Sequence, residues 1–192
     1  IHFSTDYVFD GYKKSHYTEK SATNPLNYYG KTKLNGDESI INSGCKFYIF
    51  RISWLYNINF KKNFIYKVRA KILKGKLFSL PVNQIGAPIS SDLVSEYIKI
   101  FIKKIEKEDV NSGIFNLTCK GYASRYQIGE EISKIVKKKH SIKPFKILRS
   151  QKHEAVKRPL NSRLNIKKIE KIIQINIPKW NKDLRYNLIN RK

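Results

Sequence analysis

The chain has 192 residues, which is enough for one ordinary domain with a sizeable core, and its formal net charge is +24 at pH 7. A charge of this size attracts nucleic acid, but Lys and Arg are spread along the whole chain without a zinc-finger, basic-zipper or RNA-binding motif. Cys45 and Cys119 belong to no C-x-x-C or Cys/His cluster. The sequence therefore predicts no disulfide framework, no zinc site and no specific nucleic-acid partner.

The first part of the chain alternates between strand and helix patterns. We expect a strand end at 1–4, a helix at 25–43, a strand at 46–52 and a helix at 63–74 that ends at Gly75. Asn24, Pro25 and Asn27 predict a turn and a helix cap. This alternation is typical of a parallel sheet, whose ligands bind at the carboxyl ends of the strands.

The rest of the chain is expected to form further strands and helices. We expect strands at 77–80, 113–118 and 144–148, a polar loop at 150–165, and helices at 93–107, 124–138, 166–173 and 180–189. Ser91 and Asp92 are expected to cap the helix at 93–107, and Ser124 the following one. No apolar run approaches the roughly 18 residues that a membrane-spanning helix needs.

Tyr29 and Lys33 are four residues apart on the first predicted helix. This spacing places both side chains on one helix face. Protonating a developing alkoxide near neutral pH needs an acid, and a phenol serves only when a neighbouring cation lowers its pKa. The pair therefore indicates a carbonyl reductase, although such a pair also arises by chance in a chain rich in Tyr and Lys. Lys31 is offset by two positions and is expected to point elsewhere.

Several other segments strengthen this interpretation, and together the chain resembles the extended short-chain dehydrogenases/reductases, most closely the dTDP-4-dehydrorhamnose reductases. The segments run in the order found in that family and cover most of the chain. They are Ser4 to Gly11, Asn24 to Lys33, Phe50 to Tyr56, Asn63-Phe64, Val82 to Pro88 and Arg158 to Leu164.

The resemblance implies an α/β fold with an incomplete Rossmann-like parallel sheet, helices on both of its faces, and a smaller C-terminal α+β substrate-binding region. We expect residues 1–76 to be the C-terminal half of the NAD(P)-binding domain, and 77–192 mainly to bind substrate, with some elements returning to the sheet. The chain has no Met and no G-x-G-x-x-G, and it opens inside a predicted strand. We therefore expect a C-terminal fragment that lacks the glycine-rich cofactor loop.

The implied activity is the reduction of the 4-keto group of dTDP-6-deoxy-L-lyxo-4-hexulose to dTDP-L-rhamnose, for cell-surface polysaccharide synthesis in the cytoplasm. The cofactor would be NADPH or NADH, because the residue that selects between them is expected outside this chain. Tyr29 would be the catalytic acid, and Lys33 would assist it and bind the nicotinamide ribose. The resemblance also allows a homodimer, and it implies no membrane partner.

Substrate-binding roles fall to several further residues. Thr5 would bind the substrate carbonyl oxygen; Ser4 is the competing hydroxyl, but strand alternation directs it to the opposite side. Asp6 and Tyr7 would help to hold the sugar, with a turn as the other role for Asp6. The indole of Trp54 would pack on the deoxysugar.

The remaining expected roles involve charged side chains. Arg163 would bind the diphosphate through its planar guanidinium, although a surface salt bridge would look the same in sequence. Asp92 occupies a position at which some relatives use carboxylates for Mg²⁺ between subunits. An N-cap role explains Asp92 without a metal, so magnesium stays an open alternative.

Two other functions remain open at this point. The first is a noncatalytic binding subunit, similar to the regulatory subunits of methionine adenosyltransferase, which share the segment around the Tyr-Lys pair. Trp54 favours the reductase, because a binding subunit would not need a sugar contact. The second alternative is another nucleotide-sugar reductase or epimerase of the same superfamily.

Overall fold

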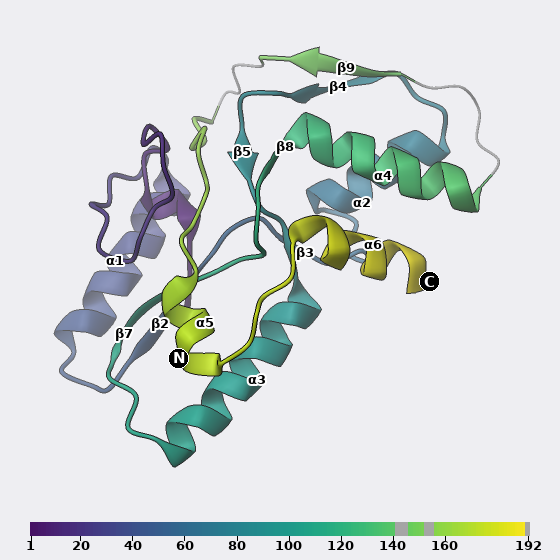
Figure 1. The fold of residues 1–192 in the computed structure, drawn as a ribbon. Coiled ribbons are helices and arrows are strands. Elements are labelled where there is room, and N and C mark those ends of the chain that lie inside the picture. The colour runs from purple at the N-terminus through teal and green to yellow at the C-terminus, as the bar shows by residue number, and fades with distance from the viewer. Residues whose placement is uncertain (141–145, 152–155, 191–192) are drawn as a thin grey trace.

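The computed structural model describes residues 1–140, 146–151 and 156–190. Its centre is a three-stranded sheet with the order β1-β2-β7, in which both neighbouring pairs are parallel (Figure 1). The strands are β1 (His2–Thr5), β2 (Tyr48–Ile52) and β7 (Gly113–Leu117). The predicted parallel α/β arrangement is therefore confirmed.

Helix α1 (Tyr28–Asn42) connects β1 to β2 and packs on one face of the sheet. It starts after Asn27, whose side chain accepts a hydrogen bond from the backbone of Gly30, so the predicted cap is confirmed. The helix begins slightly later than the expected Pro25, because the preceding residues form the turn that leads into the cap.

A buried carboxylate fastens α1 to the sheet. Asp37 Oδ2 accepts a hydrogen bond of 2.8 Å from the Ser4 hydroxyl on β1, and Arg51 Nε on β2 lies 3.4 Å from the same oxygen. Asp37 is fully buried and Arg51 is 3% exposed. A buried charge needs such partners, because an unpaired one is costly to remove from water.

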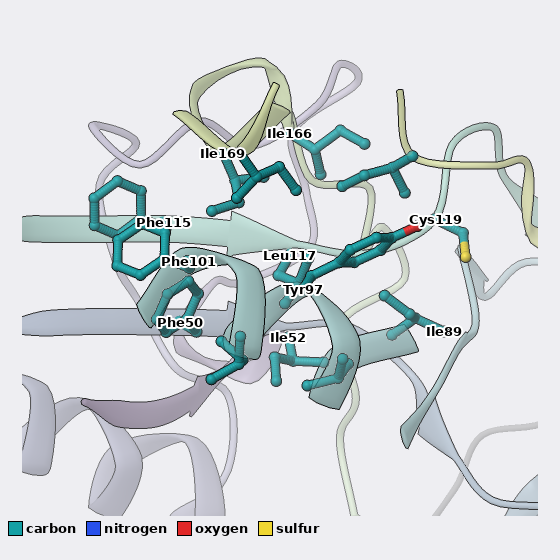
Figure 2. Close-up of a cluster of buried hydrophobic side chains, with 14 of the residues drawn as sticks. Phe50, Ile52, Ile89, Tyr97, Phe101, Phe115, Leu117, Cys119, Ile166 and Ile169 are labelled. Carbon is teal, nitrogen blue, oxygen red and sulfur yellow. The ribbon is translucent and has the colours of Figure 1, made fainter. Parts of the chain in front are cut away.

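The opposite face of the sheet is covered by α3 (Ser91–Lys107) and α5 (Lys167–Ile173). Side chains alternate along β2, so Arg51 faces α1 while Phe50 and Ile52 face α3. Figure 2 shows Phe50, Phe101 and Phe115 gathered in this core. The ring centre of Phe101 lies 5.0 Å from that of Phe50 and 5.1 Å from that of Phe115. Helices thus lie on both faces, as predicted.

A second group of elements has its own apolar core. It contains the helices α2 (Phe64–Leu73), α4 (Arg125–Lys139) and α6 (Trp180–Asn190), and the parallel pair β4 (Phe78–Pro81) and β9 (Ile147–Ser150). Figure 1 shows these helices and strands away from the three-stranded sheet.

The structure also has short elements that the sequence did not predict. They are the 3-10 turn η1 (Asp6–Val8) between β1 and α1, the parallel pair β3 (Leu55–Tyr56) and β6 (Ile89–Ser90), and the antiparallel pair β5 (Ile85–Gly86) and β8 (Ala123–Ser124). Elements of two or three residues carry no hydrophobic period, so a pattern in the sequence cannot reveal them.

Two expectations need correction. The cap of α3 is Ser90, whose hydroxyl accepts a hydrogen bond from Leu93 N, and Asp92 lies in the first helical turn. The late strand expected at 144–148 is found as β9, which begins at Ile147 and ends at Ser150, where a loop was expected. Residues 144 and 145 lie outside the described part of the chain.

Asp183 of α6 joins this helix to the short strands. Its carboxylate accepts hydrogen bonds from Ser90 N and Ser90 Oγ, both 2.8 Å, and from the Tyr56 hydroxyl at 2.9 Å. Burial raises the pKa of Asp183, and the hydrogen bonds from Ser90 oppose that rise. The contact fixes β3, which directly follows Trp54, and β6, which directly follows Pro88.

The core of Figure 2 gives the first testable prediction. Phe101→Ala should lower the free energy of unfolding by about 3–5 kcal/mol, because it removes a fully buried ring between two other rings. Tyr186→Ala is the control, since that ring is 61% exposed. Urea unfolding followed by circular dichroism measures both. Equal losses in the two variants would contradict the described core.

Candidate active site

A cavity of about 640 Å³ opens at the carboxyl ends of β1 and β2. Ligands of open parallel sheets bind at this end of the strands. Its lining comes mainly from β1, η1, α1, β2 and β3 and from the starts of α3 and α4. The lining residues are Phe3, Ser4, Thr5, Asp6, Tyr7, Tyr29, Lys33, Ile52, Trp54, Leu55, Ser91, Val94, Ser95 and Arg125. Six of the residues expected at the site, Thr5, Asp6, Tyr7, Tyr29, Lys33 and Trp54, are among them.

Tyr29 and Lys33 extend into this cavity from the first two turns of α1. The Tyr29 ring is 54% exposed, and its centre lies 5.7 Å from that of Tyr7 in an edge-to-face arrangement. Lys33 Nζ is 3.5 Å from His2 Nε2. Burial lowers the pKa of His2, and the positive charge of Lys33 lowers it further, so a neutral imidazole beside the ammonium is favoured.

Gly30 sets the position of α1 against the turn that follows β1. A Cβ atom at this position would lie 2.3 Å from the backbone oxygen of Tyr7 and 2.9 Å from the side chain of Pro25. Any larger residue would therefore push the helix away from η1. The close approach keeps the Tyr29 ring beside that of Tyr7.

The two hydroxyls at the end of β1 have different surroundings. The Ser4 hydroxyl donates a hydrogen bond to Asp37 of α1. Thr5 Oγ1 accepts a hydrogen bond of 3.2 Å from Tyr7 N, and its hydroxyl donates to Asp6 Oδ1 at 3.3 Å. Thr5 therefore caps η1 and also lines the cavity.

Asp6 is the carboxylate of the cavity, and it is 2% exposed. Burial raises the pKa of Asp6 to about 6, while the nearby hydroxyls of Ser162 and Thr5 and the charge of Arg125 act in the opposite direction. The carboxyl group thus titrates close to neutrality, where small changes in its surroundings alter its charge.

Trp54 lies at a bend of the chain, with a φ of 47°. Its ring covers Gly86, where an added Cβ would be 2.7 Å from the indole. On the cavity side the guanidinium carbon of Arg125 lies 4.4 Å from the ring centre of Trp54. The Gln84 to Pro88 segment therefore contains Gly86 because the indole needs that space.

Arg125 was not predicted as a site residue, because nothing in the sequence distinguishes it from other basic residues.

Arg163 and Asp92 do not line this cavity. Arg163 Nε donates to Asn161 Oδ1 at 2.8 Å, another nitrogen donates to the backbone of Lys14, and the guanidinium lies over the ring of Tyr122. Asp92 is half-buried in the first turn of α3. No group of three His, Cys, Asp or Glu side chains suited to a metal ion occurs among the described residues.

Within residues 1–140, 146–151 and 156–190, none of the helices combines the length and the apolar character that crossing a membrane requires.

Residues 1–191 match the family described as RmlD substrate binding domain. The chain is similar to curated proteins named dTDP-4-dehydrorhamnose reductase. The protein of this name from Sinorhizobium fredii is 30% identical over 190 residues, which are 96% of this chain and 64% of that protein. The one from Escherichia coli K12 is 32% identical over 186 residues, which are 94% of this chain and 61% of that protein. The chain thus spans less than two thirds of the length of these relatives.

Solved structures agree on the fold. A dTDP-4-dehydrorhamnose reductase from Bacillus anthracis in complex with NADP has a TM-score of 0.84 at 23% identity, and the match covers 99% of this chain and 65% of that one. A dTDP-4-dehydrorhamnose reductase from Clostridium acetobutylicum has a TM-score of 0.82 at 29% identity, with coverage of 97% and 64%. The expected Rossmann-like α/β class is confirmed by these structures.

The buried carboxyl group of Asp6 gives a pH-dependent prediction. The fold favours its neutral form, because the pKa is about 6 in the folded protein against an ordinary value of 3.8. The stability that this neutral form supplies is complete below about pH 4 and is lost as the pH rises through 6. Asn is neutral at every pH, so the stability of Asp6→Asn relative to the parent protein should rise by about 2 kcal/mol between pH 4 and 7.5.

Urea unfolding at a series of pH values measures this difference. Asp10→Asn is the control, because hydrogen bonds from Tyr12 N and the Tyr17 hydroxyl lower the pKa of Asp10. Asp10 is thus ionised in both states above about pH 4.5, and its difference curve should be flat there. Parallel curves for the two variants would show that Asp6 is not a buried titrating group.

Proposed function

Because the chain belongs to the family of RmlD substrate binding domains, we propose that it supplies the proton donor and sugar site of a dTDP-4-dehydrorhamnose reductase. The reaction is the reduction of the 4-keto group of dTDP-6-deoxy-L-lyxo-4-hexulose to a hydroxyl. One observation carries the proposal: Tyr29, Lys33 and Thr5, which come from two elements, line a single cavity at the ends of parallel strands.

The hydride would come from NADPH or NADH, and the cavity fits the nicotinamide end of such a cofactor. The Lys33 ammonium can donate hydrogen bonds to ribose hydroxyls, and the half-exposed ring of Phe3 offers an apolar surface nearby. A glycine-rich loop for the pyrophosphate is absent from the sequence. The relative from Bacillus anthracis binds NADP. We propose that residues 1–76 form the cofactor half of the site and 77–192 most of the substrate half.

Tyr29 is the proposed proton donor. Its hydroxyl would give a proton to the carbonyl oxygen of the sugar as negative charge develops there. The ammonium of Lys33, one helical turn away, stabilises the negative charge left on the phenol. The exposed position of the Tyr29 ring allows the proton to be replaced from solvent.

Thr5 would orient the carbonyl group. Its oxygen is held in place by Tyr7 N and Asp6, at the end of a strand that is itself fixed by the sheet. A rigid donor aimed at the oxygen stabilises charge that develops in the transition state. Trp54 would pack against the apolar face of the deoxysugar, and Asp6 and Tyr7 would border its hydroxyl groups.

The noncatalytic alternative gains no support. The curated relatives described above are named as reductases, and the cavity contains Trp54, the residue that favoured a sugar substrate. Solved epimerases and dehydratases of nucleotide sugars share the fold at lower identity, which leaves the choice of nucleotide sugar to the experiment.

Tyr29→Phe tests the proposed role most simply. In the whole natural protein, this variant should oxidise NADPH with dTDP-4-dehydro-L-rhamnose about a hundredfold to ten-thousandfold more slowly, because a positioned acid contributes that much. Tyr28→Phe is the matched control: this ring is 81% exposed and lines no part of the cavity, so its rate should equal that of the parent. Unchanged turnover in Tyr29→Phe would remove Tyr29 from the mechanism.

A further inference from the structure

A second cavity of about 220 Å³ adjoins the first, and the two share Trp54, Leu55 and Arg125 in their linings. The second cavity is also bordered by Asn63 and Phe64 at the start of α2, and by Arg158. The mechanism proposed above uses only the first cavity.

The guanidinium of Arg125 is held in a defined position where the cavities join. Its central carbon lies 4.4 Å from the ring centre of Trp54 and 4.6 Å from that of Phe64. Arg125 Nε donates a hydrogen bond of 2.8 Å to Gln84 Oε1. Aromatic rings contact a guanidinium through its flat faces, and its N–H donors lie in the plane. The rings and Gln84 therefore fix the direction in which these donors point.

Positive charge predominates around this position. Among the residues that the structure describes, the two linings contain the cations Lys33, Arg125 and Arg158 and a single carboxylate, that of Asp6. The charge of Arg125 acts on Asp6 and favours its ionised form. Even with Asp6 ionised, the linings keep an excess of positive charge that suits an anionic ligand.

We infer that Arg125 binds the diphosphate of the nucleotide sugar, with the sugar in the first cavity beside Tyr29 and the nucleoside directed into the second. This assignment rests on the proposed function. A diphosphate links sugar to nucleoside, so a cation where two cavities meet lies where that linker has to pass. A planar guanidinium also forms paired hydrogen bonds with phosphate oxygens. Arg163, which the sequence favoured for this role, is instead engaged with Asn161, Lys14 and Tyr122.

Calorimetric titration of the whole natural protein with dTDP and with thymidine tests the assignment. Arg125→Gln should weaken dTDP binding about tenfold to a hundredfold, as expected for lost charge-assisted hydrogen bonds, and leave thymidine binding unchanged. Arg125→Lys keeps the charge without the paired donors, so it should lose part of the dTDP affinity, again without an effect on thymidine. If Arg125→Gln does not fold, the affinities for dTDP and thymidine are compared in Arg125→Lys instead.

Two arginines serve as matched controls. Arg149→Gln removes a guanidinium that also lies over an aromatic ring, that of Tyr126, but borders neither cavity. Arg163→Gln removes the cation that the sequence favoured. Both variants should bind dTDP as the parent does. If Arg163→Gln loses affinity and Arg125→Gln does not, the inference is overturned in favour of Arg163.

Other outcomes also decide the matter. Equal losses of dTDP and thymidine affinity in the Arg125 variants would mean that Arg125 only maintains the shape of the site, and would overturn the inference. Binding of dTDP that depends on Arg125, without any turnover of the ketosugar by the whole natural protein, would refute the reductase but support the diphosphate site. If Arg125→Gln turns over the ketosugar with an unchanged KM, the reductase is supported and the diphosphate site is refuted.

Discussion

The buried contact between Asp37 and the two strands β1 and β2 is the constraint on which the site depends. The carboxylate of α1 accepts a hydrogen bond from Ser4 and pairs with Arg51, and all three side chains are nearly inaccessible to solvent. Breaking one partner would leave an unpaired charge in the interior, so this helix has one favourable position. At that position its first turn lies against η1, which directly follows β1. Tyr29 and Lys33 therefore lie over the cavity rather than on a solvated helix face.

Two close approaches complete this geometry. The backbone of Tyr7 touches the helix at Gly30, and the indole of Trp54 covers Gly86. Each glycine admits a neighbour that a side chain would exclude, and each neighbour lines the cavity. The asymmetry between Ser4 and Thr5 has the same origin. The hydroxyl of Ser4 is bound by Asp37 on α1, whereas the hydroxyl of Thr5 is bound within η1, by Asp6 and Tyr7 N.

The parts of the fold that the sequence predicted are those with a strong local signal. The spacing of Tyr29 and Lys33 defines a shared helix face wherever the helix lies, and the polar end of β1 marks a ligand-binding edge. Ser124 was predicted as a cap from its residue type at the helix start, and the structure confirms it, in a capping box with Gln127. In contrast, Ser90 was missed as the cap of α3, since the neighbouring Ser91 and Asp92 are equally good candidates from sequence.

The parts that could not be predicted depend on contacts between distant segments. Arg125 reaches the site because α4 starts beside Trp54, and the guanidinium of Arg163 is turned to Tyr122 by the same folding of the chain. Both are arginines in polar stretches, so their sequence contexts do not tell which of them faces the cavity. The buried state of Asp6 was equally hidden, because η1 is too short to produce a pattern.

The central claim is that the cavity holds a sugar carbonyl between Tyr29 and Thr5. A crystal structure of the whole natural protein with dTDP-L-rhamnose, the product of the proposed reaction, tests it most directly. The account predicts that O4 of the sugar lies within hydrogen-bonding distance of both the Tyr29 hydroxyl and Thr5 Oγ1, with the sugar ring against Trp54. A sugar bound with O4 out of reach of Tyr29 would contradict it.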